Sequence, residues 1–180
     1  MSVQNEQIRS EIDQLIERHL SVELATVSAD GVPSVSYAPY VYMGNLSFGV
    51  FLSSLAEHTH NIASNNSVSA MVITSEKDSP NLFARERVVI TCKAEIHDRK
   101  SIEFANWIPS YRERFGAIVD TLVQLADFNL HTLQPVRAVY VKGFGQAYRI
   151  SGDDMNEVEH ITNPARDAQN RNKATKRSQK

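Results

Sequence analysis

The stretch from residue 24 to residue 42 is the feature of this sequence that most constrains its fold. Two β-rich runs flank the dipeptide Asp30-Gly31. Asp-Gly between such runs is a strong hairpin signal because both residues tolerate a positive φ angle. Since proline cannot donate to a strand ladder, we expect Pro33 and Pro39 at strand starts, edges or bulges. An interrupted strand with small residues on one face favours a barrel that bends or receives a ligand.

The rest of the chain alternates between helix and strand patterns. Apolar residues recur at helical spacing in segments 3–20 and 98–125, and we expect a short helix over 55–64. In segment 98–125 we expect two helices with a break near Pro109. Strand patterns cover the segments 24–27, 34–41, 46–52, 68–73, 88–96, 128–133 and 138–150. Gly143 and Gly145 predict a bulge or a close backbone approach. The predicted class is α+β, with a small antiparallel β-barrel and helices packed outside it.

Length and composition favour one domain. A chain of 180 residues with 42% hydrophobic content can bury one substantial core, and no linker divides its middle. We expect a single domain over residues 1–160 and a basic, disordered tail over 161–180. A net charge of −2, without an aromatic-plus-basic motif, argues against nucleic-acid binding. No segment is apolar enough for a signal peptide or a membrane span, so we expect a cytoplasmic protein.

Histidines are the first candidates for chemistry. His58 and His60 lie in a predicted helix, beside Asn61. Because residues two apart on a helix point to different sides, these histidines cannot hold one metal ion together. One of them, near the helix start, could instead bind an anion with help from backbone N–H groups, and plain surface positions are the alternative. His131 could face either side of its predicted strand.

Charged residues form a second set of candidates. Arg85 and Arg87 flank Glu86 just before an apolar strand, where both arginines should point to one face. Two guanidinium groups there could form a carboxylate or phosphate clamp, and an exposed edge with weak ion pairs is an equal alternative. Asp127 lies between apolar neighbours, as a helix-stop residue or as a carboxylate turned into a site. The chain has no nucleophile elbow, Walker loop, GxGxxG or CxxC to indicate a hydrolase, a nucleotide triphosphatase or a dinucleotide dehydrogenase.

Several runs of the sequence resemble the HutZ/HugZ haem-utilisation proteins, a branch of the pyridoxamine 5′-phosphate oxidase-like, FMN-binding split-barrel superfamily. The resemblance covers about residues 8–160 and rests on runs such as SYAP, SSLAEHTHNIAS, LFARERV, QLADFNLH and KGFGQAY. It implies a homodimeric antiparallel split β-barrel with flanking helices that binds haem at the dimer interface. In that family the porphyrin ring is opened with oxygen and an electron donor, which releases iron. The resemblance therefore also implies an electron donor and a haem-delivery partner.

The resemblance assigns roles to individual residues. FMN-binding relatives carry a lysine that grips the FMN phosphate where this chain has His58. A histidine is mostly neutral at neutral pH, which favours haem over FMN. Arg87 matches a family arginine near the haem, and Arg85 and Asn61 join it as candidate contacts. Asp127 matches an aspartate that tunes the haem ligand by hydrogen bonding, so it is the candidate catalytic residue.

The axial iron ligand departs from the family pattern. The family's histidine in the loop after GDD falls at Ala165, and His160 stands five residues earlier. An extended chain covers about 3.3 Å per residue, so His160 is the candidate ligand if the loop is rearranged. The first expectation is haem binding with oxygen-dependent degradation. The alternatives are a haem storage or delivery protein without cleavage, and an FMN-dependent oxidoreductase.

Overall fold

The computed structural model describes residues 3–162, so the predicted tail lies outside the described residues from residue 163 on. The helices are α1 (Val3–Arg18), α2 (Glu57–Ser64), α3 (Ile102–Phe115) and α4 (Ile118–Gln124), with 3₁₀ turns η1 (Glu76–Asp78) and η2 (Leu82–Ala84). The strands are β1 (Ser21–Val27), β2 (Pro33–Tyr42), β3 (Phe48–Ser53), β4 (Ser67–Ile73), β5 (Arg87–His97), β6 (Phe128–Gly143), β7 (Gln146–Ser151) and β8 (Glu157–His160).

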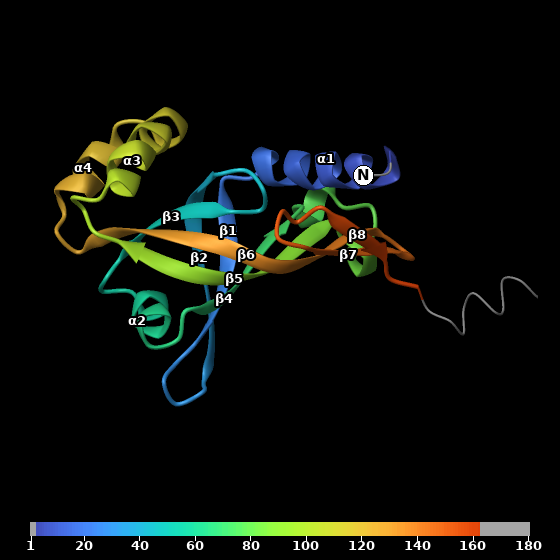
Figure 1. The fold of residues 1–180 in the computed structure, drawn as a ribbon, viewed down its shortest axis with the longest axis horizontal. Helices are drawn as coiled ribbons and strands as arrows, with labels where there is room; N and C mark the ends of the chain where they lie inside the picture. The colour runs from blue at the N-terminus through green and yellow to red at the C-terminus, as the bar shows by residue number, and fades with distance from the viewer. Residues whose placement is uncertain (1–2, 163–180) are drawn as a thin grey trace, which may run out of the picture.

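Strands β1 to β6 close into an antiparallel barrel. The strand order is β3-β2-β1-β4-β5-β6, and an additional pairing of β3 with β6 closes the ring. The first part of β6 pairs with β3 and its last part with β7. As a result β7 and β8 extend away from the barrel (Figure 1). This division of β6 between two partners is a split barrel, and the predicted α+β class is confirmed.

The predicted hairpin joins β1 and β2. The Ser28 N–H donates to the Val32 carbonyl at 2.9 Å, and Gly31, with a φ of 82°, donates its N–H to the Ser28 carbonyl. Pro33 begins β2, and Pro39 is the last β2 residue paired with β1 before the strand turns to β3. Both prolines therefore occupy a strand start or a point where the pairing changes, as the sequence predicts.

The helices bury their apolar residues on the barrel. One stripe of α1 joins the main core inside the barrel through Ile8, Ile12, Leu15 and Ile16. Helices α3 and α4 build a second core with β2, β3 and β6, while α2 lies at the same end of the barrel as α4 (Figure 1). Cys92 is buried in β5, as predicted. None of the described helices is both long and apolar enough to cross a membrane.

The predicted break near Pro109 is wrong, because α3 continues through this residue. Pro109 is exposed, and so is Ala105, whose carbonyl loses its helical hydrogen bond, so water can replace that bond. The helix ends instead at Gly116, which has a φ of 74° and donates its N–H to the Arg112 carbonyl. Glycine adopts this conformation without a steric penalty, so it ends the helix more effectively than an exposed proline interrupts it.

The predicted interruption of the strand after residue 133 is also wrong. Strand β6 is continuous to Gly143, and Val136 is accommodated as a bulge opposite Thr91 and Cys92 of β5. The register of β6 against β7 shifts between Val141 and Gly143, as predicted for Gly143. Gly145, with a φ of 68°, instead lies in the turn between β6 and β7, so the single strand predicted over 138–150 is wrong and is two antiparallel strands. A bulge absorbs a proline-containing segment without ending the strand, which period-2 patterning alone does not reveal.

Candidate functional site

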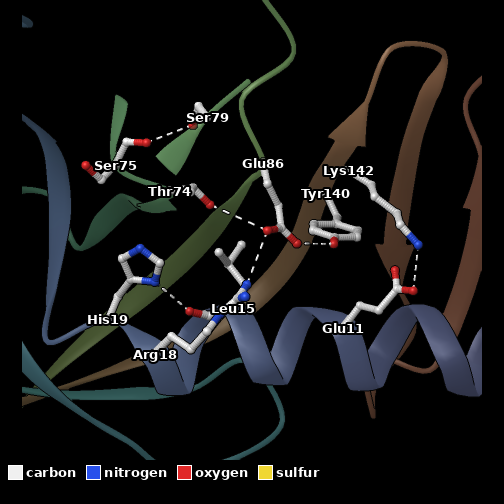
Figure 2. A network of polar contacts seen from close by, with 10 residues as sticks. All are labelled: Glu11, Leu15, Arg18, His19, Thr74, Ser75, Ser79, Glu86, Tyr140 and Lys142. Carbon is white, nitrogen blue, oxygen red and sulfur yellow. Dashed lines mark hydrogen bonds and ion pairs between the residues drawn. The ribbon is translucent and has the colours of Figure 1, made fainter. Parts of the chain in front are cut away.

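The segment that enters β5 is fixed by Glu86. Its carboxylate accepts hydrogen bonds from the Tyr140 hydroxyl at 2.6 Å and the Thr74 hydroxyl at 3.5 Å, and pairs with Arg18 of α1 at 3.2 Å (Figure 2). Burial, and then the hydrogen bond to Glu86, raise the pKa of Tyr140, so this hydroxyl stays a neutral donor. The network ties α1, the end of β4 and β6 to the entrance of β5.

The two arginines beside Glu86 have different surroundings. Arg85 donates Nε and Nη2 to the Thr74 carbonyl at 3.1 and 2.6 Å, and Nη1 pairs with Glu76 at 3.4 Å. Arg87 donates only Nη1, to the Arg85 carbonyl at 2.9 Å. Its other N–H groups have no partner within residues 3–162. Arg87 is therefore the guanidinium of this pair that can bind an anion without breaking other contacts.

Asp127 lies in the turn between α4 and β6. Its Oδ2 accepts the Ser53 hydroxyl at 2.5 Å, and its carbonyl accepts the Ser54 N–H at 2.7 Å. Ser53 in turn accepts the Thr59 hydroxyl of α2 on its carbonyl at 2.7 Å. The second carboxylate oxygen of Asp127 has no partner in the described part of the chain, so it can accept a hydrogen bond from a ligand.

Helix α2 turns two of the predicted site residues toward the barrel. Asn61 is buried and donates its side-chain N–H to the Thr26 hydroxyl at 3.0 Å. His58 places Nδ1 2.9 Å from the Ser36 hydroxyl, and its Nε2 is buried. Burial lowers the pKa of His58, while the nearby Glu57 carboxylate opposes this shift. In this arrangement His58 is neutral, and its ring nitrogens face protein.

Sequence reasoning left one buried histidine unassigned. His131 is fully buried on β6, and its Nδ1 lies 3.2 Å from the Asn129 carbonyl. A carbonyl only accepts, so Nδ1 carries the proton, and Nε2 has no protein partner among the described residues. Burial lowers the pKa of His131 to about 4. Whether the His131 side chain points into the core depends on the strands that pair with β6. The alternation of residues along one strand does not reveal those partners.

His160 lies on β8, in the extension of the sheet. Its Nε2 is 2.9 Å from the Gly145 carbonyl, and its ring packs 5.0 Å from that of Tyr148. In the neutral imidazole Nε2 therefore donates, and Nδ1 carries the lone pair. Residues paired across neighbouring strands lie on the same face of a sheet. His160 of β8 is in line, through paired residues of β7 and β6, with Val88 of β5, so these two side chains share a face. Arg87 precedes Val88 in β5, so the Arg87 side chain points to the opposite face.

The predicted site residues thus form three groups in one protomer. Arg85 and Arg87 lie at the start of β5, Asp127 in the turn between α4 and β6, and His160 on β8. Helix α4 and strand β8 lie at opposite ends of the molecule (Figure 1). Residues 3–162 hold no cluster of three or more metal-ligating side chains. One protomer therefore does not bring the three groups to one place.

Apolar surface lies beside the Asp127 turn and on strands β1, β2, β4 and β5. A cavity of about 260 Å³ beside the Asp127 turn is lined almost entirely by apolar groups, including Phe51, Ile118 and Phe128. A second apolar hollow of about 260 Å³ lies on β1, β2, β4 and β5. On the outer face of β2, Val35 and Tyr37 are 75% and 71% exposed. These surfaces suit a flat apolar ligand and a protein partner.

Comparisons with known proteins agree with this fold. A family model described as pyridoxamine 5′-phosphate oxidase matches residues 8–142. The chain is 41% identical over 154 residues to haem oxygenase HutZ of Vibrio cholerae serotype O1, covering 86% of this chain and 87% of the relative. A crystal structure described as HutZ, a haem storage protein from Vibrio cholerae, has a TM-score of 0.66 and 40% identity, covering 70% of this chain and 88% of that chain. Campylobacter jejuni ChuZ has a TM-score of 0.78 and 28% identity, covering 88% of this chain and 65% of that chain.

Proposed function

The chain belongs to the pyridoxamine 5′-phosphate oxidase-like split-barrel family, in its HutZ-related branch, and from this membership we propose that it binds haem and degrades it with oxygen to release iron. The observation that carries the proposal is the 41% identity to a haem oxygenase over 86% of the chain. The proposed activity is that of a haem oxygenase-like oxidoreductase. We also propose that the protein is cytoplasmic and works with an electron donor and a haem-delivery partner.

The proposed working unit is a homodimer. Within one protomer, Arg87 and His160 point to opposite faces of the sheet, and helix α4, which precedes the Asp127 turn, lies at the far end of the molecule from β8. Two copies that pair through the outer face of β1, β2, β4 and β5 would bury Val35 and Tyr37. Such pairing would also bring groups from the two chains to one seam. An apolar slot with a cationic edge suits a macrocycle that carries two carboxylates.

In this proposal three side chains act on the haem. Arg87 binds a propionate through its unoccupied N–H groups. His160 ligates the iron, and the free carboxylate oxygen of Asp127 accepts a hydrogen bond from an ordered water, or from the iron ligand once His160 releases the Gly145 carbonyl. The haem iron supplies the activation of oxygen when the substrate is bound. The residues of this chain bind the propionates, orient the ligand and keep water from the apolar face.

The remaining candidates act from further away. His58 reaches the polar edge of a haem only after its ring turns away from Ser36. Asn61 and Arg85 support the site through their contacts with Thr26 and with the Thr74 carbonyl. These contacts also fit an FMN phosphate poorly, because Arg85 is occupied and His58 is neutral and turned inward. No step of the proposed function uses a flavin.

A second candidate function is haem storage or delivery without cleavage. Alanine stands at position 165, which lies outside the described residues, where the family's histidine ligand is expected. The HutZ crystal structure is itself described as that of a storage protein. The two functions differ in what happens to bound haem when an electron donor is added.

Reconstituted protein with ascorbate and oxygen separates the two candidates. Degradation predicts that the Soret band decays and a bilin absorption appears, whereas storage predicts a persistent Soret band. A His160→Ala variant then tests the iron ligand, because an unchanged ferric haem spectrum would remove His160 from that role. A yellow protein with a flavin spectrum that haem does not alter would replace both candidates with an FMN-dependent oxidoreductase.

A further inference from the structure

The turn that carries Asp127 is held by an arginine from a distant part of the chain. Arg99 lies between β5 and α3, and its Nη1 donates to the Leu125 carbonyl at 2.6 Å and the Phe128 carbonyl at 3.1 Å. Its Nη2 donates to the Val123 carbonyl. These three acceptors lie on both sides of Asp127, so one guanidinium joins the end of α4 to the start of β6.

The guanidinium is itself fixed in place. It lies over the ring of Phe104 in α3, with its central carbon 5.5 Å from the ring centroid. The carbonyls at the end of a helix have no helical partners, and a cation near them is favoured by the helix dipole. A planar guanidinium can serve three carbonyls at once, whereas the single ammonium group of a lysine cannot match that geometry.

Asp127 is held from its other side by the barrel. The Ser53 hydroxyl donates to its Oδ2 at 2.5 Å, and the Ser54 N–H donates to its carbonyl at 2.7 Å. The position of the carboxylate therefore depends on two sets of contacts. The serines fix Asp127 itself, while Arg99 holds Leu125, two residues before it, and Phe128, the residue after it. Loss of the second set would let the turn move relative to the serines.

We propose that Arg99 is a positioning residue for Asp127, which holds the carboxylate at the place where it can accept a hydrogen bond from the bound ligand. The inference rests on the proposed role of Asp127 in haem binding. The contacts that carry it involve no ligand, so part of the test is made on the ligand-free protein. A purely structural Arg99 would change stability without a selective effect at Asp127.

The first experiment compares Arg99→Lys and Arg99→Gln with Arg112→Lys in the ligand-free protein. Arg112 is a matched control because it pairs with Asp120 of α4 at 2.5 Å on the surface and does not touch the turn. Amide exchange at Ser54, measured by NMR, reports the hydrogen bond to the Asp127 carbonyl. The proposal predicts exchange about fivefold faster in both Arg99 variants, the factor that one hydrogen bond of ordinary net strength supplies. Unchanged exchange, or an equal rise in the Arg112 variant, would overturn it.

The second experiment uses the haem-loaded protein. The Soret position and haem affinity are compared for Asp127→Asn, Arg99→Lys and the double variant. If Arg99 acts through Asp127, the double variant changes no more than Asp127→Asn alone, whereas additive changes contradict the proposal. Failure of the wild-type protein to bind haem would refute the proposed function. In that case the exchange measurement still decides whether Arg99 positions Asp127.

Discussion

His131 carries a fully buried imidazole in the second half of the chain. Burial lowers its pKa from 6.5 to about 4, and the nearby His58 and His97 add to the shift, while the hydrogen bond to the Asn129 carbonyl opposes it. Between these two pH values the unfolded chain binds a proton at this site and the folded protein does not. Stability should therefore fall as the pH drops from about 6.5 to about 4, and this contribution levels off below that.

Replacement of His131 by glutamine should remove this pH dependence. From pH 7 to pH 5 the wild-type protein should lose about 2 kcal/mol more in its free energy of unfolding than His131→Gln, since each pKa unit corresponds to about 1.4 kcal/mol. Urea unfolding at the two pH values measures the difference. His60→Gln, a change on the exposed side of α2, should behave as wild type. Equal losses in wild type and His131→Gln would contradict the assignment.

For individual residues, the sequence predicted which side chains are candidates for the site but not which atoms each of them contacts. Arg85 and Arg87 are equivalent by strand periodicity, yet the Thr74 carbonyl occupies Arg85 and leaves Arg87 available. Arg99 carries no sequence signal, because its three acceptors are backbone carbonyls of residues more than twenty positions away. Such contacts depend on tertiary packing, so no local pattern predicts them.

Among the elements, turn chemistry was predicted more reliably than the ends of long elements. Asp30-Gly31 forms its hairpin because the turn depends on local φ preferences. Helix α3 instead passes Pro109, since the packing of Phe104 and Tyr111 on the barrel outweighs the loss of one hydrogen bond at an exposed position. Local sequence propensity therefore predicts where helices and strands form, and tertiary packing decides where they end.

Two substitutions, one in α3 and one just after its end, should have opposite effects on stability. Pro109→Ala restores a helical N–H at an exposed position and should raise the free energy of unfolding by about 1 kcal/mol or more. Gly116→Ala places a Cβ on a residue with a φ of 74° and should lower it by about 1 kcal/mol. Chemical denaturation of both variants beside wild type measures the two signs. A stabilising Gly116→Ala would show that the helix does not end as described.

For the whole molecule, the sequence and its resemblance gave the split barrel correctly, while the arrangement of the site could not be predicted. The three groups of candidate residues are separated by strand pairing and by the length of the sheet, which only the folded chain reveals. The proposed homodimer follows from this separation and from the apolar outer face of β2. A monomer would leave Arg87 and His160 on opposite faces of one sheet.

A charge on the outer face of β2 should prevent pairing. Tyr37→Glu places a carboxylate on a side chain that is 71% exposed in the protomer, and burying an unpaired charge in an interface is strongly unfavourable. Ile102→Glu, on α3 and also 71% exposed, is the matched control. Molar mass by light scattering should give a monomer for Tyr37→Glu and a dimer for Ile102→Glu. A dimeric Tyr37→Glu would move the interface elsewhere.

Titration of the purified protein with haem, followed by its visible absorption, tests the central claim most directly. We expect a shifted Soret band that saturates at a fixed ratio of haem to protein dimer. Arg87→Ala should weaken this binding through the loss of a propionate contact. A spectrum of free haem at every addition, with the protein folded and dimeric, would contradict the account.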